Sequence, residues 1–102
     1  MKLVLTTIDS REAAETLARA IVTSRLAACV NIVDRVRSIY WWEGEVQHAE
    51  EMILLIKTTP EHLESLEQFI REHHPYDLPE FMVLEPASVS NEYLEWVRSS
   101  TR

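Results

Sequence analysis

The fold is decided by residues 27–56, which read AACVNIVDRVRSIYWWEGEVQHAEEMILLI. Val, Ile and aromatic residues dominate on both sides of Asp34-Arg35, which indicates one long strand with a bulge or bend at that point. Glu43-Gly44-Glu45 is a turn signal, and the apolar residues 52–56 follow it as the next strand. Residues 27–56 therefore predict a long β-hairpin.

A short strand and a helix precede this hairpin. Residues 2–8 are rich in Val, Leu, Ile and Thr and are too few for a helix, which favours a strand. Asp9 or Ser10 can cap the helix that follows, and Glu12 completes a capping box with Asp9. We expect this helix to end near Arg25. Its apolar residues recur at helical spacing: Ala14, Leu17, Ala18, Ile21 and Val22.

A helix, a strand and a last helix follow the hairpin. Thr59 can cap the first of these helices, and Pro75 prevents it from continuing. Residues 81–84 predict a fourth strand, and Ser90 or Asn91 can cap a short last helix. The predicted buried stripe of the first helix consists of Leu63, Leu66, Phe69 and Ile70.

The order strand, helix, strand, strand, helix, strand predicts an α+β, ferredoxin-like βαββαβ sandwich with a short C-terminal helix, in a single domain over residues 1–102. Both long helices of this fold lie on one face of the sheet. Side chains alternate along a strand, so residues 40–42, 52–56 and 81–84 place large apolar groups on both faces. The face without helices would expose too much apolar surface for a monomer, and we expect another subunit to cover it.

The composition excludes several classes of protein. The chain has 102 residues, 46% hydrophobic and 26% charged, which is typical of one soluble globular domain. Its net charge of −7 argues against nucleic acid and anionic membranes as partners. The single cysteine cannot form an intrachain disulfide, and no run of residues is long and apolar enough for a spanning helix. We therefore expect a cytoplasmic protein.

One cysteine and two histidines are the candidate metal ligands. Cys29 lies in a β-like stretch, where a thiol usually behaves as a small buried hydrophobe; a soft-metal ligand or a nucleophile is the alternative. His73 and His74 end the second helix, where imidazoles can cap carbonyl groups. They can converge on zinc, copper or nickel only if the backbone leaves the helix at His74, which the following proline favours.

Charged and aromatic residues around the hairpin allow two interpretations. The Trp41-Trp42 pair suits a core or an interface better than a platform for ligand stacking. Lys57, beside an apolar strand, either extends to solvent or faces a polar cleft, where it would pair with an anion or with a carboxylate such as Glu80. The acidic residues near the turn predict a solvated tip: Glu43, Glu45, Glu50 and Glu51.

Five blocks of sequence, in this order, resemble the CutA divalent-ion tolerance family over nearly the whole chain. They are LAACVNIV at 26–33, SIYWWEG at 38–44, IKTT at 56–59, HPYDLPE at 74–80 and YLEW at 93–96. The resemblance implies a ferredoxin-like protomer in a tight homotrimer, and an architectural relation to the trimeric PII proteins, whose inter-subunit clefts bind small ligands. Copper binding is attributed to members of this family.

The resemblance also implies candidate ligands for copper. The family's His-His pair before Pro-Tyr corresponds to His73 and His74. A cysteine in the first strand, proposed as a third ligand in the family, is replaced by Thr6. A hydroxyl is a poor ligand for a soft metal, so Cys29 or another chain would have to supply that donor.

Three functions follow as hypotheses. The first is a non-enzymatic homotrimer of cation homeostasis that binds copper or another divalent cation. The second is a PII-like sensor that binds a small ligand in a cleft near Lys57, Tyr76 and Glu80; an enzyme ranks third. The residues expected at the trimer interface are Tyr40, Trp41 and Trp42.

Overall fold

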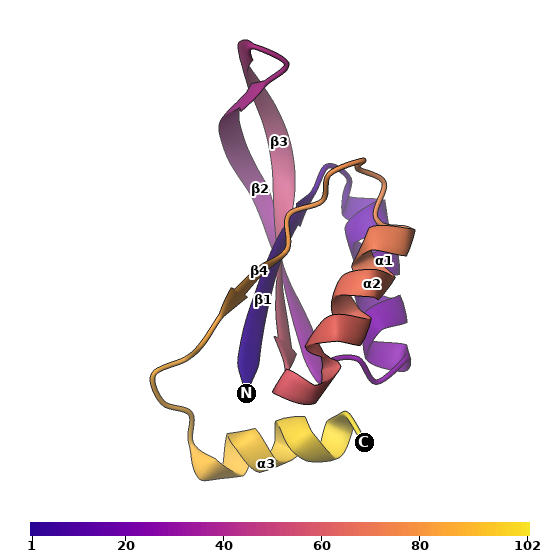
Figure 1. Ribbon diagram of the computed structural model, residues 1–102, viewed down its shortest axis with the longest axis vertical. Helices are drawn as coiled ribbons and strands as arrows, with labels where there is room; N and C mark the ends of the chain where they lie inside the picture. The colour runs from indigo at the N-terminus through magenta and orange to yellow at the C-terminus, as the bar shows by residue number, and fades with distance from the viewer.

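A four-stranded antiparallel sheet with two helices on one face forms the body of the molecule (Figure 1). The computed structural model describes residues 1–102. Its elements are β1 (Lys2–Ile8), α1 (Arg11–Thr23), β2 (Cys29–Trp42), β3 (Glu45–Thr58), the 3₁₀ turn η1 (Pro60–His62), α2 (Leu63–His73), β4 (Met82–Leu84) and α3 (Asn91–Ser100). The strand order is β2-β3-β1-β4, which confirms the ferredoxin-like prediction.

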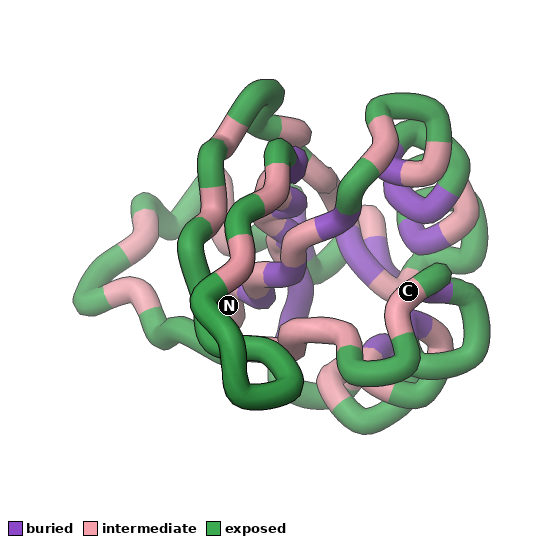
Figure 2. The backbone as a smooth tube through the Cα atoms, turned by 90° about the horizontal axis from the view of Figure 1, so that it is seen from above, coloured by how far each residue is buried: buried purple, intermediate pink, exposed green.

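The core lies between the sheet and the helices α1 and α2. In Figure 2 the buried stretches gather where the sheet and the helices meet. The register pairs Val4 with Ile56 and Thr6 with Leu54, so these side chains point to the same face of the sheet. The fully buried residues of the core include Val4, Ile8, Ile21, Leu54, Ile56, Leu66 and Ile70.

Local signals explain most boundaries of the elements. The Ser10 hydroxyl accepts a hydrogen bond from the Ala13 N–H (3.0 Å), so Ser10 caps α1, which ends at Thr23, slightly before the expected Arg25. Thr59 precedes a 3₁₀ turn, and its hydroxyl contacts the His62 ring instead of a backbone N–H. Strand β4 begins at Met82, one residue after the predicted start at residue 81. No helix of the structure is long and apolar enough to cross a membrane.

The hairpin of β2 and β3 is longer than the rest of the sheet. The pairing shifts between Val33 and Val36, where Arg35 has a φ of 57°, so the predicted bulge is confirmed. Glu43 and Gly44 both have positive φ, as a two-residue hairpin turn of type I′ requires. Beyond the end of β1, residues 36–51 project from the body as a two-stranded ribbon, which we call the arm (Figure 1).

Apolar side chains remain uncovered on the arm and on the open face, the face of the sheet opposite α1 and α2. Ile39 and Trp41 on the arm are 74% and 73% exposed. Because neighbouring residues of a strand point in opposite directions, Trp41 and Trp42 leave apolar surface on both sides of the arm. Other exposed apolar residues of these two surfaces are Val33, Tyr40, Val46, Met82 and Leu84.

Candidate functional site

His74 ends α2 and holds the loop that follows to the sheet. The Tyr76 backbone N–H donates to His74 Nδ1 (3.1 Å), so Nδ1 is the unprotonated nitrogen. His74 Nε2–H then donates to the Thr7 carbonyl oxygen at 2.7 Å. The side chain is only 7% exposed. Both ring nitrogens are therefore used within the protomer, and His74 offers no free lone pair to a metal ion in this conformation.

His73 differs from His74 because its ring lies on the surface. Its Nδ1–H donates to the Phe69 carbonyl oxygen (2.8 Å), and the ring stacks on the Phe69 ring with centroids 4.0 Å apart. This hydrogen bond leaves the lone pair of Nε2 free and fixes the orientation of the ring, as is usual for metal-ligating histidines. His73 also lines a surface pocket with Glu12 of α1. Of the two histidines, only His73 has the geometry of an available ligand.

Of the other proposed soft-metal positions, Cys29 lies far from His74, and Thr6 points into the core. Cys29 is half-buried at the start of β2 and pairs with Lys57, which in turn pairs with Leu3 of β1. His74 contacts Thr7, four residues further along β1 and about 13 Å away at the rise of a strand. The Thr6 hydroxyl is enclosed on the core face without a hydrogen-bond partner. No three His, Cys, Asp or Glu side chains of one protomer converge on a possible metal position.

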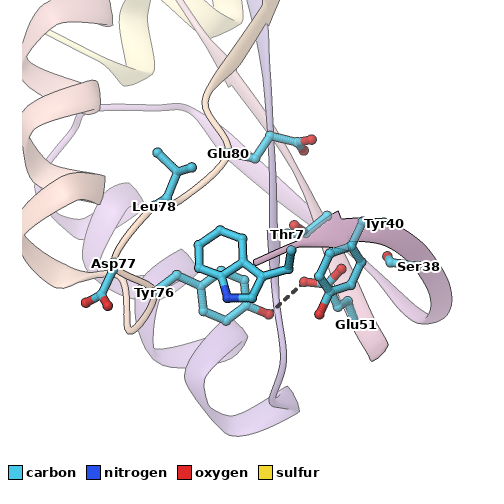
Figure 3. Close-up of a pocket in the computed structure, with 9 residues that line it drawn as sticks. Thr7, Ser38, Tyr40, Glu51, Tyr76, Asp77, Leu78 and Glu80 are labelled. Carbon is cyan, nitrogen blue, oxygen red and sulfur yellow. Dashed lines mark hydrogen bonds between the residues drawn. The ribbon is translucent and has the colours of Figure 1, made fainter. Parts of the chain in front are cut away.

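A pocket opens between the arm and the loop that follows α2 (Figure 3). Its volume is about 470 Å³. Strand β1 contributes Thr7, and the nine lining residues are Thr7, Ser38, Tyr40, Trp42, Glu51, Tyr76, Asp77, Leu78 and Glu80. The structure therefore places Tyr76 and Glu80, two of the three residues of the expected ligand cleft, in one pocket.

A short hydrogen bond joins the two sides of this pocket. The Tyr76 hydroxyl donates to Glu51 Oε2 at 2.6 Å, and Glu51 is only 7% exposed (Figure 3). Burial, with the hydrogen bond and charge of Glu51, raises the pKa of Tyr76 far above its usual range. Burial and then the Glu51 carboxylate raise the pKa of Glu80. The two carboxyl groups therefore share one poorly hydrated, negative environment.

Lys57 does not belong to this pocket, which corrects its predicted pairing with Glu80. Its Nζ lies 5.7 Å from the centroid of the Tyr93 ring, in the helix α3. The antiparallel register explains the error: Lys57 pairs with Leu3, whereas the pocket lies at the Thr7 end of β1. None of the nine lining residues carries a positive charge.

The comparisons with known proteins agree with this architecture. A family model described as CutA1 divalent ion tolerance protein matches residues 2–100. The chain belongs to the CutA1 divalent ion tolerance family. The divalent-cation tolerance protein CutA of Thermus thermophilus is 46% identical over 100 residues, which cover 98% of this chain and 97% of that protein. A solved structure of the divalent cation tolerance protein (Cut A1) from the same organism matches it with a TM-score of 0.95, at 46% identity and full coverage of both chains.

Relatives in the CutA1 family differ in length. The chloroplastic protein CutA of Arabidopsis thaliana is 46% identical over 99 residues, which cover 97% of this chain and 54% of that protein. This chain therefore spans about half the length of that relative. The family and its Thermus thermophilus member are named for tolerance of divalent ions.

Glu51 is the residue of this CutA1-family chain that the sequence interpretation missed. Glu43, Glu45 and Glu50 are exposed, as predicted for a solvated tip, but Glu51 is buried beneath Tyr76. The sequence signal for this burial is the position of Glu51, which directly precedes the apolar residues 52–56. Because side chains alternate along a strand, Glu51 points to the same face of the sheet as Ile53. An acidic residue in that position lies at the edge of the sheet's body, not at the hairpin tip.

Proposed function

We propose that this protein is a non-enzymatic homotrimer that acts in cation homeostasis and binds copper or a similar divalent ion. Membership of the divalent ion tolerance family supports the relevance of such ions. The observation that carries the proposal is the free, oriented Nε2 of His73. A cytoplasmic location is part of the proposal, and the single free thiol of Cys29 is consistent with a reducing compartment.

His73 is the first ligand in this proposal. Neutral imidazole is a good ligand for copper and zinc, and the Glu12 carboxylate lines the same pocket as His73. One protomer supplies fewer than three convergent donors, so water or another copy of the chain completes the coordination. We expect affinity for Cu²⁺ on the order of micromolar, as for an incomplete site. Cys29, on the opposite end of the sheet, is the alternative if the bound ion is copper(I).

The uncovered apolar surface supports the homotrimer. A two-stranded ribbon is marginally stable alone, and the arm carries exposed apolar residues on both sides. Strand β2 is an edge strand along its whole length, and on β3 only Met52 to Thr58 pairs with β1. Unpaired edges and apolar surface together favour association with further copies of the chain. Three copies about a threefold axis would form a closed assembly.

A copper titration of the purified protein tests the metal site. His73→Ala is expected to weaken Cu²⁺ binding at least tenfold, whereas His48→Ala, which removes a histidine from the arm, is the matched control. Binding should also weaken in acid because imidazole coordinates only when neutral. Unchanged binding in His73→Ala would contradict the assignment. A loss confined to Cys29→Ser would move the site to the thiolate.

A further inference from the structure

The pocket that His73 lines lies between α1 and the end of α2, on the helix side of the molecule. Its volume is about 380 Å³. Glu12, Thr16 and His73 are exposed, so the pocket is open to solvent in a single protomer. None of its lining residues lies on the arm or the open face, which are the surfaces that the homotrimer is proposed to bury.

Short and apolar side chains of α1 form much of the wall of this pocket. Ala13, Thr16, Leu17 and Ala20 line it, and this spacing places them on one face of the helix. Leu17 is only 4% exposed, whereas the two alanines are half-buried. An alanine side chain ends at Cβ, so the pocket stays open where a longer side chain would fill it. This wall suits an apolar group and offers no ligand to a metal ion.

The remaining residues leave a metal ion at His73 incompletely coordinated. The Nε2 atom of His73 is one donor, and Glu12 is the only carboxylate that lines the pocket. No three His, Cys, Asp or Glu side chains of the protomer converge on one position. Copper(II) prefers a tetragonal arrangement of nitrogen and oxygen ligands, so further positions on the ion stay open. The pocket volume is within the usual range for small organic ligands, which is more than a single ion needs.

We propose that His73 takes up copper(II) as its one-to-one chelate with an α-amino acid whose side chain is apolar. This inference rests on the proposed metal site and names the form in which that site receives its ion. The amino nitrogen and a carboxylate oxygen of the amino acid stay bound to copper, and His73 Nε2 displaces one water from it without electron transfer. The apolar side chain packs against Ala13, Leu17 and Ala20. The chelate keeps a positive charge, which the Glu12 carboxylate attracts.

Calorimetry on the unaltered full chain compares copper(II) leucinate with copper(II) glycinate, each as the one-to-one complex. The two complexes bind copper through the same atoms, so only the side chain of the amino acid differs. We expect the leucinate to bind about tenfold more tightly, because its side chain is buried in the pocket. His73→Ala should remove this difference. His48→Ala, which removes an exposed histidine of the arm, should leave it unchanged.

Electron paramagnetic resonance tests whether the amino acid stays on the ion. Copper(II) leucinate made with ¹⁵N-leucine is added to the protein, and the spectrum of the bound copper is recorded. We expect coupling to the ¹⁵N nucleus of leucine and to a ¹⁴N nucleus of His73 in the same species. Bound copper without ¹⁵N coupling would show that the protein removes the ion from its chelate.

A substitution that fills the pocket then separates the side chain from the metal. Ala20→Leu adds a leucine side chain to the wall, and leucine is a good helix former. It should abolish the preference for leucinate over glycinate and leave the binding of copper(II) alone unchanged. Thr23→Leu is the matched control, since Thr23 is exposed on α1 and does not line the pocket. It should retain the preference, and circular dichroism checks that both variants are folded.

Three results would overturn this inference alone. They are equal affinities for the leucinate and the glycinate, bound copper without ¹⁵N coupling, and equal effects of Ala20→Leu and Thr23→Leu. In each case the proposed metal site stands as long as copper(II) alone binds the wild type more tightly than His73→Ala. Binding of copper(II) alone that does not depend on His73 would instead overturn the metal site and, with it, this inference.

Discussion

The helix-covered side of the sheet and the arm contain the same kinds of apolar residue in opposite surroundings. Leu54 and Ile56 are fully buried under α1 and α2, whereas Ile39 and Trp41 are mostly exposed on the arm. The apolar residues of the helix-covered side are explained within one chain, because their burial stabilises the fold. The apolar residues of the arm are explained only if another molecule covers them. The difference separates residues that determine folding from residues available for assembly.

The largest effect on unfolding is expected in the helix-covered core. Leu54→Ala should lower the free energy of unfolding by about 2–5 kcal/mol, because it removes buried methyl groups and leaves a cavity. Denaturant titration measures this loss. Ile39→Ala, an aliphatic truncation on the arm, is the matched control and should cost below about 0.5 kcal/mol within a protomer.

Protein concentration distinguishes the two contributions at Ile39. A larger loss that shrinks on dilution, as the wild type itself dissociates, would report assembly, because association stabilises folded protomers by mass action. A concentration-independent loss in Ile39→Ala as large as that in Leu54→Ala would instead show that the two regions do not differ.

Charge on the arm is expected to prevent assembly without unfolding the protomer. Trp41→Glu or Trp42→Glu should convert trimers to monomers at micromolar concentration, since a carboxylate buried in an interface costs several kcal/mol. Light scattering measures the mass. Ser65→Glu adds the same charge to the exposed surface of α2 and should leave the mass unchanged. If both tryptophan variants remained trimers, the arm would not be the interface.

The sequence predicted those features whose signals are local. The bulge at Asp34-Arg35, the turn at Glu43-Gly44 and a cap at Asp9 or Ser10 depend on neighbouring residues only. The structure contains the bulge and the turn, and its cap is Ser10. The two-sided apolar pattern likewise predicted the uncovered surface.

The candidate site was harder to predict because its hydrogen bonds join distant residues. His74 contacts a carbonyl 67 positions away, at Thr7, and this contact distinguishes it from His73. The partners of Glu51 and Lys57 depend on the register and on the path of the loop after α2. Neither is encoded in the spacing of residues around these positions.

The pocket beside the arm provides a smaller test of the same comparison. Tyr76→Phe should lower the free energy of unfolding by about 1–3 kcal/mol, because it leaves a buried Glu51 oxygen without its donor. Tyr93→Phe, on α3, is the control and should change stability by less than about 0.5 kcal/mol. Equal losses in the two variants would show that the Tyr76 bond does not stabilise the arm against the loop.

The smallest effect is expected from the charge of Glu80 and depends on pH. Burial and the Glu51 carboxylate raise the pKa of Glu80 above its ordinary value of 4.5, so folding favours the protonated form. Stability from this group is thus fully present below pH 4.5 and is lost as the pH rises through the raised pKa. Glu80→Gln, which stays neutral, should match the wild type at about pH 4 and become the more stable of the two by about pH 8. Denaturant midpoints across this range measure the difference, with Glu50→Gln reporting the loss of an exposed charge. A Glu80→Gln variant that lost stability relative to the wild type as the pH rose would show that the pocket stabilises the charged carboxylate, which would contradict its desolvation.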